Sequence, residues 1–251
     1  MTEETTDAVP EAAEPHSPAR LQHFSGFDLV YCGLIFWPAI LLFRLGGVSV
    51  IEWLPHPLAD ETMALAITLS RIAGYVLTAW LVMRWIVAKR DGGAQAIGLS
   101  LPVSPSAWAW AFGTYIVGIS AWVGFVYFAA AKLAAQPGLS FSFLANPASW
   151  TSQSWHILLL TVVVAPVVEE IVFRGVGMAG FCNSFTPGLA MLFTTLLFTL
   201  SHGGLTFSIF LVGILLSAIR LKTGSLYCCM AVHAFHNLIV IAVIGRLFPA
   251  P

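Results

Sequence analysis

The amino-acid sequence predicts an all-α protein, a polytopic bundle of about six to eight transmembrane helices around a buried polar cavity. Hydrophobic residues make up 58% of the 251 residues and charged residues only 9%, whereas about a quarter of the residues in a soluble domain are charged. Long apolar runs also recur along the chain, and polar groups rarely interrupt them. We therefore expect an integral membrane protein.

The segment 1–25 is the exception to this composition. It contains five acidic residues against a single arginine, together with three prolines. Such a segment cannot bury enough apolar surface to fold, so we expect a disordered acidic tail. The segment lacks the basic start and the apolar core of a signal peptide. Residues 26–251 are predicted to form a single transmembrane helical domain.

About seven apolar runs approach or reach the roughly 20 residues that a helix needs to cross the hydrocarbon core. They lie at 27–46, 62–88, 106–131, 153–180, 188–202, 205–221 and 226–247, with glycine and proline between them. The fifth and sixth runs are short, so we expect them to be tilted, joined within the membrane or partly re-entrant. Basic residues flank the connections after the second and the sixth run: Arg84, Lys89, Arg90, Arg220 and Lys222. Their position predicts a cytoplasmic location for these connections and for the tail.

Charge and cysteine content exclude two other classes of protein. The net charge is −1, and the 11 Lys and Arg residues are scattered, so the chain offers no basic patch of the kind that nucleic acid requires. The four cysteines lie in or beside apolar stretches. They are expected to be small buried hydrophobes, and neither a disulfide framework nor a metal site.

The acidic residues are distributed in a way that points to function. Of the 12 Asp and Glu residues, two follow residue 91, and these are the neighbours Glu169 and Glu170 inside an apolar run. An ionised carboxylate there costs about 2.5–3.5 kcal/mol on insertion scales. Arg174 stands four positions beyond Glu170, the spacing of an ion pair on one helix face. Glu169 points about 100° away and is predicted to face elsewhere.

Three histidines in the last third of the chain are candidates to meet these acids. His202, His233 and His236 fall within apolar sequence. Asn237 lies four residues beyond His233 and therefore on the same helix face, whereas His236 could instead make a helix contact. Counting about 1.5 Å per residue from the expected cytoplasmic ends places Glu169, His202, His233 and Asn237 near the middle of the membrane.

A carboxylate, imidazoles and an amide are the groups that hydrolyse a peptide bond with water: one base, one proton carrier and donors for the oxyanion. We find no local signature of a serine or cysteine nucleophile. Zinc is an alternative, bound by Glu169, His202 and His233, because two histidines and a carboxylate can make an open catalytic site. The helical HExxH motif is absent, which favours a site without a cofactor.

At these residues the chain resembles the CAAX prenyl protease and bacteriocin-processing family of intramembrane proteases. EEIVFR at 169–174 matches the family's EExxxR motif, FTLSH at 198–202 matches FxxxH, and HAFHN at 233–237 matches HxxxN. The resemblance covers about residues 97–240, with a catalytic core at about 150–240. It implies a glutamic-type endopeptidase that acts on a membrane-associated peptide or protein, expected in the bacterial plasma membrane.

The resemblance also implies roles for the motif residues. Glu169 and His202 would activate the water, His233 and Asn237 would hold the oxyanion or complete the polar site, and Glu170 and Arg174 would support them. Relatives from eukaryotes remove the last three residues of prenylated proteins, and bacterial relatives process diverse peptides. A prenylated substrate is therefore not assumed for this chain.

Two other functions are compatible with acids and histidines in a helical bundle. A proton-coupled transporter uses the same residues as a relay, but many transporters contain inverted repeats, and residues 1–150 hold no second copy of the motifs. A catalytically silent scaffold or immunity protein is the other alternative. Arg71, inside the second run, suits either one, although pairing with a backbone carbonyl or snorkelling to the interface would also account for it.

Overall fold

The computed structural model describes residues 28, 60–133, 154–202 and 206–247, and in these ranges the chain forms helices and no strand. The predicted all-α fold class is confirmed. The acidic tail at 1–25 and, apart from Asp28, the first apolar run at 27–46 lie outside the described residues. The other six runs each form a helix close to its predicted bounds: α2 (Asp60–Trp85), α4 (Pro105–Leu133), a helix from Trp155 to Cys182, α8 (Pro187–Ser201), α9 (Phe207–Thr223) and α10 (Leu226–Leu247).

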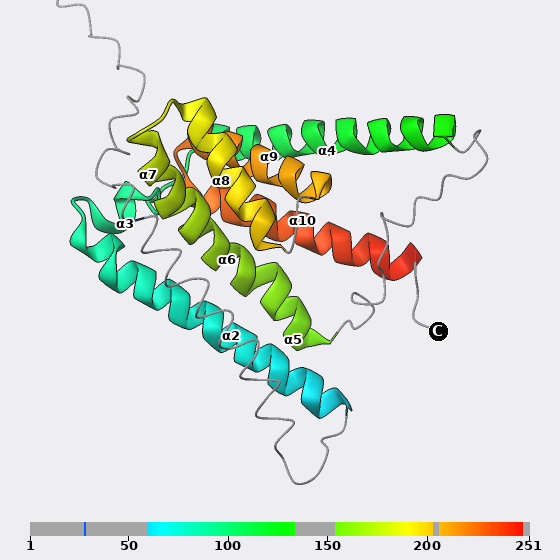
Figure 1. The fold of residues 1–251 in the computed structure, drawn as a ribbon, viewed down its shortest axis with the longest axis horizontal. Coiled ribbons are helices and arrows are strands. Elements are labelled where there is room, and N and C mark those ends of the chain that lie inside the picture. The colour runs from blue at the N-terminus through cyan, green and yellow to red at the C-terminus, as the bar shows by residue number, and fades with distance from the viewer. Residues whose placement is uncertain (1–27, 29–59, 134–153, 203–205, 248–251) are drawn as a thin grey trace, which may run out of the picture.

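The helix Trp155–Cys182 lies at the centre of the bundle and changes its winding four times. It consists of α5 (Trp155–Leu158), the π-helix η5 (Leu159–Val164), α6 (Ala165–Glu170), the π-helix η6 (Ile171–Gly177) and α7 (Met178–Cys182). It packs against α2 on one side and against α8 and α10 on the other (Figure 1). Because π-turns inside α-helices are rare and frequently mark functional sites, the two π-helices on either side of α6 indicate a candidate functional site in this segment.

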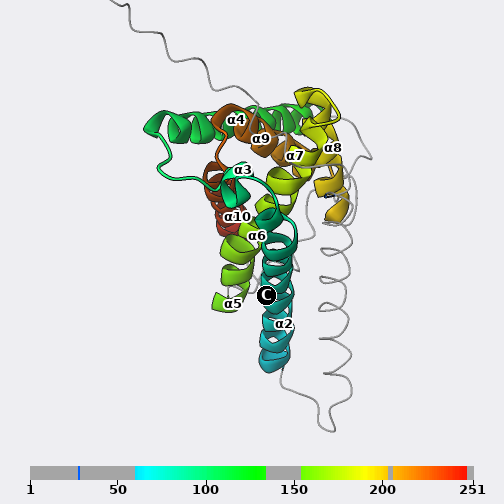
Figure 2. The ribbon, with the colours of Figure 1, turned by 90° about the vertical axis from the view of Figure 1, so that its left-hand side faces the viewer.

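α4 lies on the outside of the bundle, where it packs on α9 and α10 (Figure 2). Its contact face is small and tightly packed, since Ala111 and Tyr115 are 0% and 2% exposed. Its outer face carries large apolar side chains that are more than half exposed, such as Val117 and Phe125. An outward apolar face of this kind fits contact with lipid.

Among the described residues, three helices are long and apolar enough to cross a membrane: Glu61–Lys89, Pro105–Phe125 and Trp155–Cys182. Pro187–Ser201 and Leu226–Ala242 are shorter apolar helices. The fifth and sixth runs are short, as the sequence predicts, with α8 spanning 15 residues and α9 spanning 17. A protein that crosses the bilayer therefore fits the described part of the chain.

The two basic connections meet on one side of the bundle. The N–H of Leu226, at the start of α10, donates to the carbonyl of Gly98, which lies between α3 (Gly93–Ala96) and α4. The approach is close, because a Cβ added to Gly98 would lie 2.5 Å from the carbonyl oxygen of Gly224. Gly98 also has a φ of +89°, a conformation that glycine adopts readily. The basic ends of α2 and α9 thus share one face of the membrane domain.

The described cysteines agree with their predicted role. Cys228 and Cys229 are fully buried, Cys182 is half-buried, and all three are free thiols. Cys228 and Cys229 pack in the cluster between α4, α9 and α10. Cys32 lies outside the described residues.

Candidate active site

Glu169 lies between two imidazole rings. Its side chain is 7% exposed, and its Oε2 atom is 3.9 Å from Nε2 of His202 and 3.9 Å from Nε2 of His233. Its other oxygen, Oε1, accepts a hydrogen bond of 3.0 Å from the hydroxyl of Tyr75 on α2. Side chains from four helices therefore meet at one carboxylate. The sequence predicts a similar membrane depth for Glu169, His202 and His233, and these three side chains lie together.

His202 is held by the turn of α8 that precedes it. Its Nδ1 lies 2.8 Å from the carbonyl oxygen of Phe198. A carbonyl oxygen can only accept, so Nδ1 carries the hydrogen and Nε2 is directed to Glu169. The side chain of His202 is 31% exposed, compared with 5% for His233. The site is therefore more open at His202 than at His233.

His233 is held by the second carboxylate. Its Nδ1 lies 2.9 Å from Oε1 of Glu170, and the same oxygen accepts a hydrogen bond of 2.8 Å from Nη1 of Arg174. A carboxylate that is paired with an arginine acts as an acceptor, so Nδ1 of His233 is the donor and Nε2 is again directed to Glu169. The predicted division of the two neighbours is observed, with Glu170 on Arg174 and Glu169 facing away.

Arg174 connects this pair to the rest of the bundle. Its side chain is fully buried, its Nη2 donates to the carbonyl oxygen of Gly213 on α9, and its guanidinium lies 4.2 Å from the ring centre of Phe198. A Cβ on Gly213 would lie 2.7 Å from Cγ2 of Thr195, so the absence of a side chain lets α8 and α9 approach closely. The charges that hold His233 are thus buried among four helices.

Asn237 bonds to the backbone of the central helix. Its Nδ2 donates to the carbonyl oxygen of Thr161 at 2.8 Å. In η5 the N–H of Ala165 bonds to the carbonyl of Leu160, five residues earlier, and in the same register the partner of Thr161 would be Pro166, which has no N–H. Asn237 supplies the missing donor. It stands one turn beyond His233 on α10, and the catalytic role that the resemblance implies for it stays a prediction.

His236, the third histidine of the last third of the chain, faces α4. Its Nδ1 lies 3.0 Å from the hydroxyl of Tyr115, and the two rings meet edge to face. This contact joins α10 to the outer helix. His236 therefore makes the helix contact that the sequence left open, and it is separate from the residues around Glu169.

Zinc requires closer ligands than the structure shows. Zinc holds nitrogen and oxygen ligands at about 2.0–2.2 Å in a tetrahedron, so two ligand atoms lie about 3.3–3.5 Å apart. The corresponding distances from Glu169 Oε2 to the two Nε2 atoms are 3.9 Å. Within the described ranges, no group of three or more His, Cys, Asp or Glu residues is arranged to hold a metal ion. A chelation experiment therefore tests whether activity depends on a metal ion.

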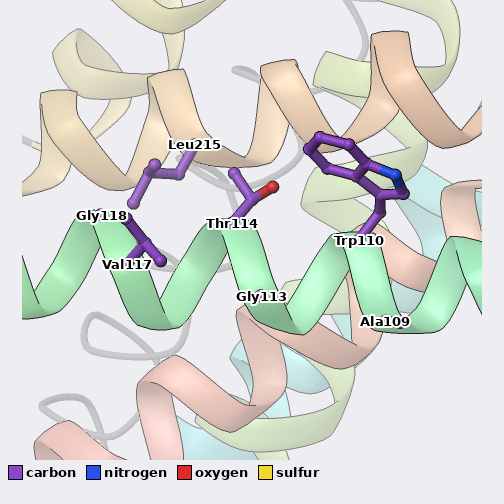
Figure 3. A pocket seen from close by; sticks show the side chains of 7 residues that line it. All are labelled: Ala109, Trp110, Gly113, Thr114, Val117, Gly118 and Leu215. Atoms are coloured by element: carbon purple, nitrogen blue, oxygen red, sulfur yellow. The ribbon is translucent and has the colours of Figure 1, made fainter.

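A separate apolar groove runs along α4 (Figure 3). It lies where α4 packs on α9, whereas the polar groups around Glu169 come from α2, α6, α8 and α10. Its lining is almost entirely apolar and comes mostly from α4: Ala109, Trp110, Gly113, Thr114, Val117, Gly118 and Leu215. The groove offers no titratable group, and its exposed apolar lining fits contact with lipid.

Tyr75 is the residue at this site that the sequence did not reveal. A single tyrosine in an apolar helix has no local signature, because tyrosine is common near membrane interfaces for structural reasons. The signal that could have found it is spacing, since Thr68, Arg71, Tyr75 and Thr78 follow one another at intervals of three and four residues. Such intervals place polar groups on one face of α2.

Residues 151–239 match a known protein family, described as Type II CAAX prenyl endopeptidase Rce1-like. No curated protein and no solved structure matches the chain significantly. The matched segment contains all three motifs, and it confirms the resemblance to the CAAX prenyl protease family. Together with the three long apolar helices, the match identifies an integral membrane protein related to membrane proteases.

Proposed function

We propose that this member of the CAAX-protease-like family is an intramembrane endopeptidase, which hydrolyses a peptide bond of a membrane-associated peptide or protein with a water activated by Glu169 and His202. The observation that carries the proposal is the convergence of two imidazole Nε2 atoms on one oxygen of Glu169, each at 3.9 Å. This distance is too long for a direct hydrogen bond. It suits a water molecule that bonds to the carboxylate and to an imidazole together.

The surrounding contacts support Glu169 as the base. Both rings carry their Nδ1 hydrogen toward fixed acceptors, the Phe198 carbonyl and the Glu170 carboxylate, so both Nε2 atoms face the water position. The Oε1 atom of Glu170 is bonded to both Arg174 and His233, and its fully buried carboxylate is the counter-ion of Arg174. Glu169 has one oxygen bonded to Tyr75 and one oriented toward the rings.

The reaction follows from these positions. Glu169 takes one proton from the water, and the hydroxide oxygen bonds to the scissile carbonyl carbon. The oxyanion that forms is stabilised by the Nε2–H of protonated His233, whose Nδ1 stays on Glu170, and by the second amide hydrogen of Asn237. The C–N bond then breaks, and the proton held by Glu169 passes through His202 to the leaving nitrogen. The products are a carboxylic acid and an amine, and the enzyme returns to its starting state.

The orientation and the partners are part of the same proposal. The basic ends of α2 and α9 share one face of the bundle, which supports a cytoplasmic location for that face and for the N-terminal tail by the positive-inside tendency. The host membrane is proposed to be the bacterial plasma membrane. The partners are membrane lipid and a membrane-associated peptide or protein, with no cofactor required.

The test is the cleavage of a peptide library by the purified protein, with variants of the residues around the water. Glu169→Gln and His202→Ala are expected to lower kcat/KM at least 100-fold, since each removes a group that moves the proton. Glu61→Gln, an exposed acid at the start of α2, is the matched control and should cleave at the rate of the parent. If Glu169→Gln cleaves as fast as the parent, the proposal is wrong. Proton flux in liposomes without any cleavage would assign the chain to the transporters.

A further inference from the structure

The apolar groove along α4 has a lysine at one end. Lys222, in the last turn of α9, places its Nζ atom 4.8 Å from the ring centre of Trp110. Trp110 lines this end of the groove, and Val117 and Gly118 line the other end (Figure 3). Lys222 is exposed, and Trp110 is 56% exposed. One end of an otherwise apolar groove therefore carries an accessible positive charge.

The end with the lysine lies at the basic face of the bundle. Lys222 is followed by the short connection to α10, where the N–H of Leu226 donates to the carbonyl of Gly98, shortly before α4. Trp110 is five residues from the start of α4 at Pro105. Tryptophan and lysine near the ends of membrane helices are typical of the boundary between headgroups and hydrocarbon. The groove therefore begins at this boundary and continues along α4 into the hydrocarbon.

The length of the groove matches one leaflet of a bilayer. Its lining on α4 extends from Ala109 to Gly118, about 14 Å along the helix, and half of the hydrocarbon core is about 15 Å. The deep end is closed, because a Cβ on Gly118 would lie 2.5 Å from Cδ2 of Leu215. The middle is open, since a Cβ on Gly113 would meet nothing within 4 Å. A groove with these limits suits one hydrocarbon chain.

We propose that this groove binds an anionic phospholipid of the leaflet at the basic face, with one acyl chain along α4 and the phosphate on Lys222. A lysine ammonium binds phosphate as a point charge, and basic pockets between membrane helices on the cytoplasmic side bind anionic headgroups. The indole of Trp110 adds an N–H donor beside the ammonium. The site shares no residue with the groups around Glu169, so it does not depend on the proposed protease activity.

A transmembrane helix of another protein is the other occupant to consider. Ala109 and Gly113 are four residues apart, the spacing of small residues at many helix contacts in membranes. An apolar partner helix, however, offers no anion to Lys222 at the end of the groove. A phospholipid supplies both the chain and the anion. The charge at the end of the groove therefore favours the lipid.

The test is photo-crosslinking in nanodiscs of phosphatidylcholine that contain a trace of a photoreactive lipid. Phosphatidylglycerol and phosphatidylcholine with the same diazirine-bearing acyl chain are compared, and mass spectrometry measures the labelling of residues 109–118. The wild-type protein should be labelled about fivefold more by phosphatidylglycerol, which is the effect of one basic residue near the membrane surface. Lys222→Gln should make the two lipids equal, and Lys222→Arg should keep the preference, because a guanidinium also binds phosphate. Equal labelling of the wild type by both lipids would overturn the proposal.

A matched control separates this site from a general attraction of anionic lipid to the basic face. Lys89 lies 4.6 Å from the ring centre of Trp85 at the end of α2, and neither residue lines the groove. Lys89→Gln removes the same charge from the same kind of pair and should leave the labelling of 109–118 unchanged. If Lys89→Gln lowers the preference as much as Lys222→Gln, Lys222 does not define a site and the proposal is wrong.

A second variant tests the acyl chain. Gly113→Leu fills the open middle of the groove without a clash and should lower the labelling of the remaining groove residues by both lipids at least fivefold. Unchanged labelling would place the chain elsewhere and refute the proposal. If Gly113→Leu instead dissociates a dimer of the wild-type protein, and the two lipids label the wild type equally, the groove is a protein interface and the inference is wrong.

Discussion

Exchange of Glu169 and of Glu170 for glutamine should separate catalysis from stability at two adjacent positions. Glu170 is 0% exposed and accepts hydrogen bonds of 2.8 Å and 2.9 Å from Arg174 and His233. Glu170→Gln removes the charge and leaves the fully buried Arg174 without its counter-ion. Loss of one partner of a buried ion pair costs about 3–5 kcal/mol, a large part of the ~5–15 kcal/mol by which a protein is stable.

Glu169→Gln should cost far less stability. Its carboxylate accepts one protein hydrogen bond, of 3.0 Å from Tyr75, and a glutamine oxygen can still accept it. We therefore expect a loss of about 1 kcal/mol or less. Activity should fall at least 100-fold, because an amide cannot take a proton from water.

The assay is reversible unfolding of the purified protein in mixed detergent micelles, followed in parallel with peptide cleavage, with Glu61→Gln as the exposed control. Equal stability of the Glu169 and Glu170 variants would refute the division of roles. A Glu170→Gln protein that folds as well as the parent but has lost activity to the same extent as Glu169→Gln would mean that the roles of the two carboxylates are exchanged.

Three further outcomes follow from the same geometry. Tyr75→Phe removes one hydrogen bond to Glu169 and keeps the ring, so kcat should fall about tenfold while KM and unfolding stay near those of the parent; an unchanged kcat would remove Tyr75 from the site. Cleavage should survive exhaustive chelation, and loss of activity that zinc restores would establish a metal enzyme. Gly213→Ala places a Cβ 2.7 Å from Thr195 Cγ2 and should destabilise the protein by about 1–3 kcal/mol. Gly113→Ala, with open space at its Cβ, is the control and should leave the stability unchanged. Equal unfolding curves for the two variants would contradict the close packing of α8 on α9.

The sequence predicts the features of this site that depend on helical spacing. An interval of four residues joins Glu170 to Arg174 and Phe198 to His202, and both contacts are present. The apolar runs also predict six described helices at nearly their observed bounds. These predictions succeed because hydrophobicity and helix geometry are local properties of the chain.

The features that depend on tertiary packing are not readable in this way. The π-turns before and after α6 have no local sequence pattern. The first of them, η5, shifts the hydrogen-bond register so that the Thr161 carbonyl accepts from the Asn237 amide. Tyr75 lies 94 residues before the carboxylate that it contacts, so its partner appears only when α2 is packed on the central helix. His236 falls in the same category, since its partner Tyr115 lies 121 residues away.

The three motifs share one physical design, in which each contains a pair of fixed positions one helical turn apart. In every motif one residue faces the proposed water or its neighbours, and a second residue fixes that group or its helix. Glu169 is followed by the Glu170–Arg174 pair, which holds His233. His202 is fixed by the carbonyl of Phe198, whose ring also lies 4.2 Å from the Arg174 guanidinium.

The third motif completes this design, because Asn237 ties the turn of α10 beyond His233 to the helix that carries Glu169. Polar groups in a lipid-embedded bundle have no bulk water to satisfy them, so each reactive side chain needs a bonded partner within the protein. The anchoring residues restrict the reactive groups to single orientations, and proton transfer over hydrogen-bond distances requires such restriction. Loss of an anchoring residue should therefore weaken activity through misplacement of its partner, and for Asn237 this loss adds to that of its proposed contact with the oxyanion.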